Sequence, residues 1–188
     1  IGRGINPIST HRSNWNKNGL YIAIKGGKPA ISHGHMDIGS FVFDAKGIRW
    51  ALDLGAHNYK ALADKKVFIW DGRNKYDHRW KVARYTNFLH NTLVVNNDLQ
   101  EPQGYGEIIS HSDSLGFQNT IIDITALYNN YFTSAKRGVS LVDKNFVLIQ
   151  DELKNGPLQS KVRWAMLTHD NIEIIDSTSA IIRKGDEE

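Results

Sequence analysis

Apolar and polar residues alternate over short stretches along most of this 188-residue chain, and turn-forming residues separate the stretches. Alternation with a period of two is typical of strands that bury one face, because successive side chains of a strand point to opposite sides. Only residues 59–71 have a pattern that could hold a short helix. The expected strands lie within 19–25, 40–55, 90–97, 106–113, 120–128, 138–153, 161–170, 172–176 and 180–185.

The turns between these runs predict the fold class. Turn signals such as AKG (45–47), NND (96–98) and DKN (143–145) recur at the short intervals typical of antiparallel hairpins. We therefore predict an all-β protein, an antiparallel two-layer β-sandwich with little α-helix. The start of the chain is rich in Gly, Asn and Ser, which predicts a linker-like lead-in over 1–18 that crosses the surface before one domain over 19–188.

Composition narrows the partners and the chemistry. The chain contains no cysteine, so His, Asp and Glu are the side chains left to bind a metal ion. No apolar stretch approaches the roughly 20 residues that a membrane helix needs, and we expect no membrane span. A net charge of +3 favours anionic partners only weakly. Since the basic aromatic motifs of nucleic-acid-binding domains are missing, no nucleic-acid partner is expected.

The segment ISHGHMDIGSF (31–41) concentrates polar chemistry ahead of an apolar run. If it forms a strand, His33, His35 and Asp37 share one face with steps of about 7 Å, and two such histidines could bind one metal ion. Ordinary hydrogen-bonded strand histidines are the alternative. Asp37 itself and three residues at other strand ends are candidates for a third ligand: Asp53, His57 and His90. A turn aspartate at Asp53 and a half-buried strand histidine at His90 remain the simpler interpretations of those two residues.

Three blocks, in this order, resemble the carboxy-terminal β-sandwich of the heparinase II/III family of polysaccharide lyases. They are HGHMDIGSF (33–41), an Asp-x-Gly turn at 53–55 and His-Asn-Thr at 90–92. Less specific stretches extend the likeness over most of the chain, at 2–5, 123–128 and 137–153. The resemblance implies the same sandwich fold and an active cleft at which the three blocks meet.

The resemblance also implies separate roles for the two neighbouring histidines. It assigns His33 to catalysis, and it assigns His35, Asp53 and His90 to a structural zinc ion. A set of two histidines and one aspartate suits zinc, with a fourth position for water. Such an ion would join segments that are distant in sequence and hold His33 in place, without acting as a Lewis acid.

The implied activity is β-elimination in acidic polysaccharides that contain uronic acids, such as heparan sulfate, alginate or hyaluronan. His33 suits such proton transfer, because imidazole titrates near neutral pH. Substrate contact is predicted for four residues placed between the Asp53 and His90 blocks, with packing as the alternative for each: Tyr59, Tyr76, Trp80 and Arg84. For Asp123, Tyr128, Arg137 and Asp151, structural hydrogen bonding is the preferred interpretation.

Members of the family carry further catalytic groups on an amino-terminal (α/α) toroid, which this sequence does not contain. We therefore expect the chain to be one domain of a longer enzyme, inactive or nearly so alone, and the family suggests a periplasmic or secreted location. The competing hypothesis is a non-catalytic carbohydrate-binding or structural sandwich that keeps the motif only as a metal clip. The presence of His33 favours the lyase, because a metal clip alone does not require it.

Overall fold

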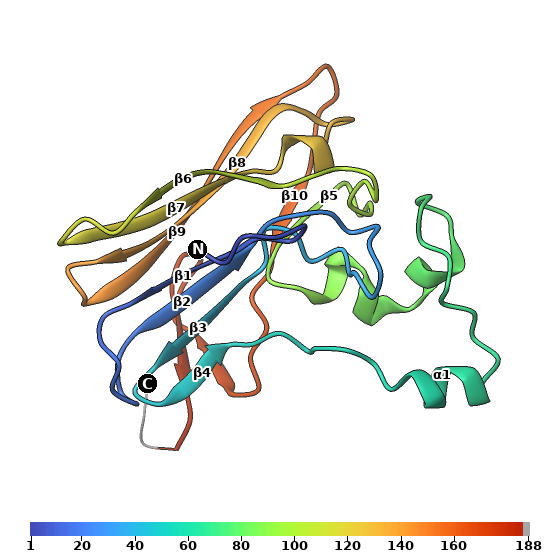
Figure 1. Ribbon diagram of the computed structural model, residues 1–188. Helices are drawn as coiled ribbons and strands as arrows, with labels where there is room; N and C mark the ends of the chain where they lie inside the picture. Colours follow the sequence, from blue (N-terminus) through green and yellow to red (C-terminus); the bar gives the residue numbers. More distant parts are fainter. Residues whose placement is uncertain (186–188) are drawn as a thin grey trace.

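Two four-stranded antiparallel sheets form the body of the computed structural model, which describes residues 1–185 (Figure 1). The first sheet has the order β1-β2-β3-β4, with bounds Ile8–Arg12, Tyr21–Lys25, Phe41–Ala45 and Ile48–Ala51. The second has the order β6-β7-β8-β9, with bounds Glu107–Ser112, Phe117–Asp123, Phe132–Val142 and Phe146–Asn155. The two sheets face each other as layers, which confirms the predicted β-sandwich.

The main core lies between these sheets because each contributes one apolar face. Ile22, Ile24 and Phe41 from the first sheet form one cluster with Ile122 and Val139 from the second. A smaller cluster outside the sandwich contains Met36, Leu62, Ile69, Trp80 and Tyr85. This second cluster supports the irregular segments that carry the candidate site.

Tight turns set the strand registers. Asp143 and Lys144, at the turn between β8 and β9, both have positive φ, 49° and 56°, and the Asn145 N–H closes the turn by donating to the Val142 carbonyl at 2.8 Å. The resulting register places Arg137 directly opposite Asp151. The turn predicted at 143–145 is therefore confirmed, and it aligns a cation with an anion across the two strands.

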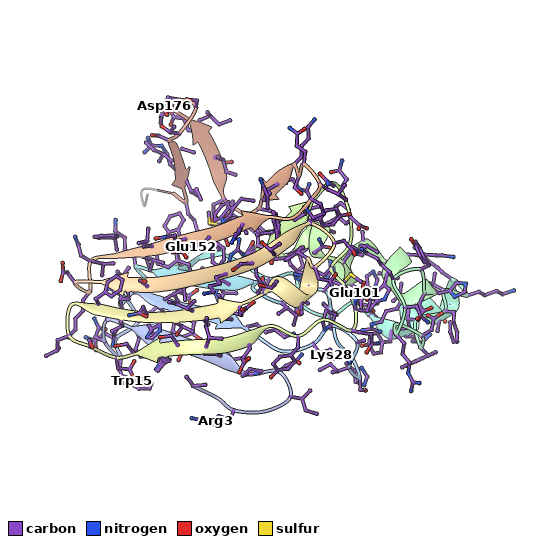
Figure 2. The ribbon with its side chains drawn as sticks, turned by 90° about the horizontal axis from the view of Figure 1, so that it is seen from above. Arg3, Trp15, Lys28, Glu101, Glu152 and Asp176 are labelled. Atoms are coloured by element: carbon purple, nitrogen blue, oxygen red, sulfur yellow. The ribbon has the colours of Figure 1, made fainter. Side chains whose placement is uncertain are left out.

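The remaining elements are short. β5 (Leu93–Val95) pairs with β10 (Val162–Trp164), and β11 (Asn171–Ile174) pairs with β12 (Ala180–Arg183) in a hairpin that projects from the sandwich, with Asp176 at its tip (Figure 2). Six residues, Tyr59–Asp64, form α1, within the range predicted for a short helix. The 3₁₀ helices span His78–Lys81, Ala83–Tyr85, Asn87–Leu89 and Thr125–Leu127. Among the described residues no helix is long and apolar enough to cross a membrane.

The structure corrects the prediction of an amino-terminal linker. Residues 1–18 were expected to cross the surface as a linker, but β1 lies within them and pairs with β2 along all five of its residues. Ser9 and His11 of β1 are buried. The sandwich therefore begins at Ile8, and β1 forms an edge of the first sheet.

Candidate functional site

The loop that carries His33 and His35 is not a strand, so the expectation of one shared strand face is wrong. Residues 31–40 form turns and bends, and β3 begins only at Phe41. Two glycines explain this: a Cβ on Gly34 would lie 2.2 Å from the Pro29 carbonyl oxygen, and Gly39 has φ +77°. Both positions favour glycine, because another side chain would clash or strain the backbone.

Arg79 holds this loop in place. Its Nε and Nη2 donate to the Gly34 carbonyl at 3.0 and 2.8 Å, and its Nη1 donates to the Ile69 carbonyl at 3.0 Å. The guanidinium also lies over the ring of Tyr85, 4.4 Å from its centroid. Arg79 is 6% exposed. The clamp fixes the backbone between His33 and His35, and no sequence motif predicted it.

His35 and His90 come together in the interior beside the smaller cluster. Their ring centroids are 5.4 Å apart, and both side chains are buried. His90 Nδ1 lies 2.7 Å from Asp53 Oδ2, so the carboxylate orients this imidazole. His90 Nε2 is buried and has no hydrogen-bond partner among the described residues. An orphaned imidazole nitrogen of this kind is suited to binding a metal ion.

Asp37 also belongs to this group. His35, Asp37 and His90 each offer a ligand atom within 4.8 Å of the others, whereas Asp53 contacts His90 on its Nδ1 side. Lys25 Nζ donates to both Asp37 carboxylate oxygens, at 2.8 and 2.6 Å. Asp37, one of the candidates named from the sequence for a third ligand, therefore lies in one group with His35 and His90, and Asp53 reaches this group through His90 Nδ1.

The ionisation states of the group suit a divalent cation. Burial lowers the pKa of His35 to about 4, against the opposing charge of Asp37. Burial by itself would raise the pKa of Asp53, but hydrogen bonding and charge from His90 outweigh it and lower that pKa to about 2. At neutral pH the group therefore offers a neutral imidazole and an ionised carboxylate, the forms in which these side chains bind metal.

The two residues that follow His90 serve the framework. Asn91 Nδ2 donates to the Phe41 and Leu52 carbonyls at 2.7 and 2.9 Å, and its Oδ1 accepts from the Leu167 N–H at 2.6 Å. Thr92 Oγ1 donates to the Ile38 carbonyl at 2.8 Å. Of the His-Asn-Thr block, only His90 therefore has a side-chain nitrogen left for chemistry.

Arg137 ties the second sheet to this framework. Its Nε and Nη2 donate to Asp151 at 2.7 and 2.9 Å, and its Nη1 donates to the carbonyls of Gly39 and Asn91 at 2.9 and 3.0 Å. Arg137 is fully buried. Arg137 and Asp151 therefore make structural hydrogen bonds, as the sequence interpretation preferred.

His33 lies apart from the buried pair, at the surface. Its Nδ1 is 2.8 Å from the Tyr59 hydroxyl, and the two rings stack with centroids 5.6 Å apart. Its φ of +60° is uncommon for any residue except glycine. Backbone strain of this kind concentrates at functional sites.

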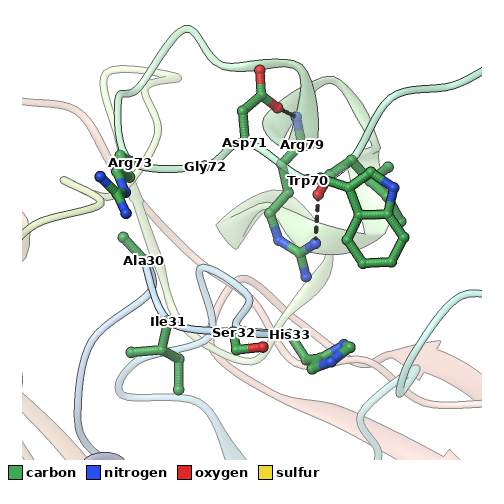
Figure 3. A pocket seen from close by; sticks show the side chains of 10 residues that line it. Ala30, Ile31, Ser32, His33, Trp70, Asp71, Gly72, Arg73 and Arg79 are labelled. Atoms are coloured by element: carbon green, nitrogen blue, oxygen red, sulfur yellow. Dashed lines mark hydrogen bonds between the residues drawn. The ribbon is translucent and has the colours of Figure 1, made fainter.

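A pocket of about 250 Å³ opens beside His33. Figure 3 shows Ser32 and His33 on one wall, with Trp70, Asp71 and Arg73 on the opposite loop. Asp71 accepts from the backbone N–H groups of His78 and Arg79 at 3.1 Å and thereby shapes that loop. Trp70 is 69% exposed. The pocket thus combines an imidazole, an aromatic face, a cation and the Asp71 carboxylate.

The family model described as "Heparinase II/III-like, C-terminal" matches residues 11–188. The chain belongs to this family. Among curated proteins, none matches the sequence.

The fold of this heparinase II/III-like domain is similar to that of solved structures. It resembles the heparan sulfate lyase HepC from Pedobacter heparinus with a TM-score of 0.67 and 20% identity, covering 91% of this chain and 24% of that one. It resembles the heparinase III-BT4657 gene product with a TM-score of 0.65 and 18% identity, covering 88% and 23%. The chain therefore spans about a quarter of the length of these relatives.

The four residues predicted to contact substrate occupy different surroundings in this heparinase II/III-like domain. Tyr59 contacts His33 through its hydroxyl and packs against the smaller cluster, and Tyr76 is 91% exposed. Trp80 is 5% exposed and packs in the smaller cluster. Arg84 Nη1 donates to the Leu54 carbonyl at 3.0 Å and holds the segment after Asp53. Trp80 and Arg84 thus have the surroundings of packing and positioning residues, the alternative named for them.

Trp70, Asp71 and Arg73 were missed. They lie in the segment IWDGR (69–73), whose only sequence signal is a glycine between charged residues, which indicates a loop without indicating which wall it forms.

Proposed function

We propose that this domain is the β-sandwich part of a polysaccharide lyase that cleaves uronic-acid polymers by β-elimination. The observation that carries the proposal is His33, an exposed imidazole at a pocket, held by Tyr59 and by a strained backbone. A domain that served only as a metal clip would have no use for this arrangement. Family membership supports the same reaction class.

β-Elimination requires one base and one acid. The base removes the C5 proton beside the uronate carboxylate, the electrons of that bond form the C4–C5 double bond, and the glycosidic oxygen leaves C4 with a proton from the acid. His33 serves as one of these groups or donates a hydrogen bond to the carboxylate, where charge builds up in the transition state. Contact with the Tyr59 hydroxyl through Nδ1 leaves Nε2 of His33 for the substrate.

The pocket suits an anionic sugar. Arg73 provides a cation beside the pocket, and the exposed ring of Trp70 offers a surface on which a sugar face can pack. Tyr59 and Tyr76 are proposed as further substrate contacts. Heparan sulfate is the first substrate to test, because one structural relative is named a heparan sulfate lyase. Alginate and hyaluronan are the next candidates.

We propose a structural zinc ion for the buried pair. The orphaned Nε2 of His90 and the neighbouring His35 fit such an ion, with Asp53 completing the set as a ligand or as the carboxylate that orients His90. Bound zinc would supply a link between the loop at 31–40 and the segments at 53 and 90. His33 lies outside this set, so its proton transfer does not depend on direct contact with the ion.

An amino-terminal toroid in the parent protein is proposed as the partner that completes the cleft. The length of the relatives supports this, since the chain covers about a quarter of them. A periplasmic or secreted location stays a prediction from the family.

The function is tested by incubating the complete parent protein with heparan sulfate, alginate and hyaluronan, and by following the ultraviolet absorbance of the new C4–C5 double bond. The lyase hypothesis predicts unsaturated product from at least one polymer. Retention of a polymer on the protein with no unsaturated product from any of them would favour the carbohydrate-binding alternative.

A further inference from the structure

A second group of metal-ligand side chains lies at the opposite part of the sandwich from His35 and His90. His11 belongs to β1, an edge strand of the first sheet, and His111 belongs to β6, an edge strand of the second. Asp113 follows β6 in the turn to β7. Each of the three offers a ligand atom within 4.8 Å of the others. The group therefore bridges the two sheets along one open edge.

One nitrogen of each imidazole contacts buried hydroxyl groups. His11 Nε2 lies 2.8 Å from Thr120 Oγ1, and His111 Nδ1 lies 2.9 Å from Ser9 Oγ and 3.0 Å from Thr120 Oγ1. Ser9 Oγ and Thr120 Oγ1 are 2.7 Å apart. If each neutral imidazole donates its N–H to these hydroxyls, the lone pairs of His11 Nδ1 and His111 Nε2 point away from them.

The other nitrogen of each ring faces the same carboxylate. His11 Nδ1 lies 3.4 Å from Asp113 Oδ1, and His111 Nε2 lies 3.2 Å from Asp113 Oδ2. His11 is 2% exposed, and its Nδ1 has no hydrogen-bond partner among the described residues. When the N–H groups of both rings donate to the hydroxyls, a lone pair of each ring faces the Asp113 carboxylate, and a cation between them would contact all three side chains.

We propose that His11 Nδ1, His111 Nε2 and the Asp113 carboxylate bind a divalent transition-metal ion, zinc being the best fit, with water as fourth ligand. Tetrahedral zinc with bonds of about 2.0–2.1 Å places its ligand atoms about 3.3 Å apart. Each imidazole nitrogen lies near that distance from one oxygen of Asp113, His11 Nδ1 at 3.4 Å from Oδ1 and His111 Nε2 at 3.2 Å from Oδ2. The two imidazole rings are neighbours, with centroids 4.8 Å apart and an angle of 14° between them.

The role of this ion would be to close the sandwich at one edge. β1 and β6 belong to different sheets, so no strand pairing joins them. An ion bound to both strands in the folded state stabilises that state by mass action. The proposal concerns residues outside the lyase site, and it stands or fails independently of the proposed activity.

The test is zinc titration of the metal-stripped chain, with bound zinc counted by elemental analysis after dialysis. The account expects about two zinc ions per wild-type chain and about one in Asp113→Asn and in His111→Ala. These two positions are exposed or partly exposed, so folding should survive, which circular dichroism checks. Asp143→Asn, in the exposed turn between β8 and β9, is the matched control and should keep the wild-type count.

Thermal unfolding gives a second measure. Zinc should raise the unfolding midpoint of the wild type and of Asp143→Asn by more than that of Asp113→Asn. Equal zinc content and equal zinc-induced shifts in Asp113→Asn and the wild type would overturn the proposal. It would also be overturned if His35→Ala removed all the bound zinc while Asp113→Asn removed none.

Discussion

At the scale of single residues, two carboxylates near the buried histidines differ in what already neutralises them. Asp37 receives two hydrogen bonds from Lys25, whereas the hydrogen-bond partners of Asp53 are His90 and the Gly55 N–H. Because a carboxylate already paired with lysine is a poorer ligand for a second cation, Asp53 is the better candidate to serve the ion. This difference can be tested by parallel substitutions.

Asp53→Asn should lower the affinity for zinc at the His35–His90 site by about 10–100-fold, because it removes either a ligand or the group that orients His90. Asp37→Asn, which removes the same charge nearby, should retain most of the zinc. Both are measured by zinc titration in an Asp113→Asn background, so that the edge site does not add to the count. Loss of zinc in Asp37→Asn with retention in Asp53→Asn would identify Asp37 as the ligand instead.

At the scale of elements, the site depends on loops whose shape is fixed by side chains from other segments. Arg79 supplies three hydrogen bonds to the loops at Gly34 and Ile69, and lysine at this position could not reproduce that planar fork. Arg84, by contrast, uses one guanidinium nitrogen on a partly exposed segment.

Arg79→Lys should therefore lower the free energy of unfolding by about 1–3 kcal/mol or more, since it leaves buried carbonyl groups without partners. Arg84→Lys, the matched control, should cost clearly less. Urea unfolding of both variants followed by fluorescence measures the difference. Equal stability of the two variants would show that the Arg79 clamp is not needed to hold the loop.

The sequence predicted the strands better than the loops, because strands follow from local sequence patterns. Burial alternates along most of β7, β8 and β9, so the alternating sequence pattern specifies these strands. It misled at 31–40, where Gly34 and Gly39 permit turns, so His33 and His35 face different surroundings. The resemblance separated their roles, which the alternating pattern could not do. The Arg79 clamp and the Trp70 wall depend on contacts between distant segments, which local patterns do not encode.

At the scale of the whole molecule, Asp98 connects the site region to the second sheet. It accepts from Lys75 Nζ at 2.5 Å, from the Tyr131 hydroxyl at 2.7 Å and from the Leu99 N–H at 2.8 Å. Lys75 follows the pocket loop, and Tyr131 immediately precedes β8. Burial favours a raised pKa for Asp98, but these hydrogen bonds outweigh it, and the net pKa is below the ordinary value of 3.8.

A carboxyl group whose pKa is lower in the folded state stabilises the protein above its unfolded pKa, and this contribution disappears as pH falls through the folded pKa. Asp98→Asn should therefore lower the unfolding midpoint at neutral pH, and the gap to the wild type should shrink below about pH 4. Chemical unfolding at a series of pH values measures the gap. Asp143→Asn is the control, and a gap for Asp98→Asn that stays constant with pH would contradict the role of its charge.

The separation of His33 from the two histidines of the proposed zinc site is the central claim, and turnover by His33→Ala in the complete parent protein tests it most directly. Release of unsaturated product from the preferred polymer should fall by about 10²–10⁴-fold, as expected when a general acid or base is removed. Zinc content and the unfolding midpoint should stay at wild-type values, and the exposed control His169→Ala should keep full activity. Near-normal turnover by His33→Ala would contradict the account.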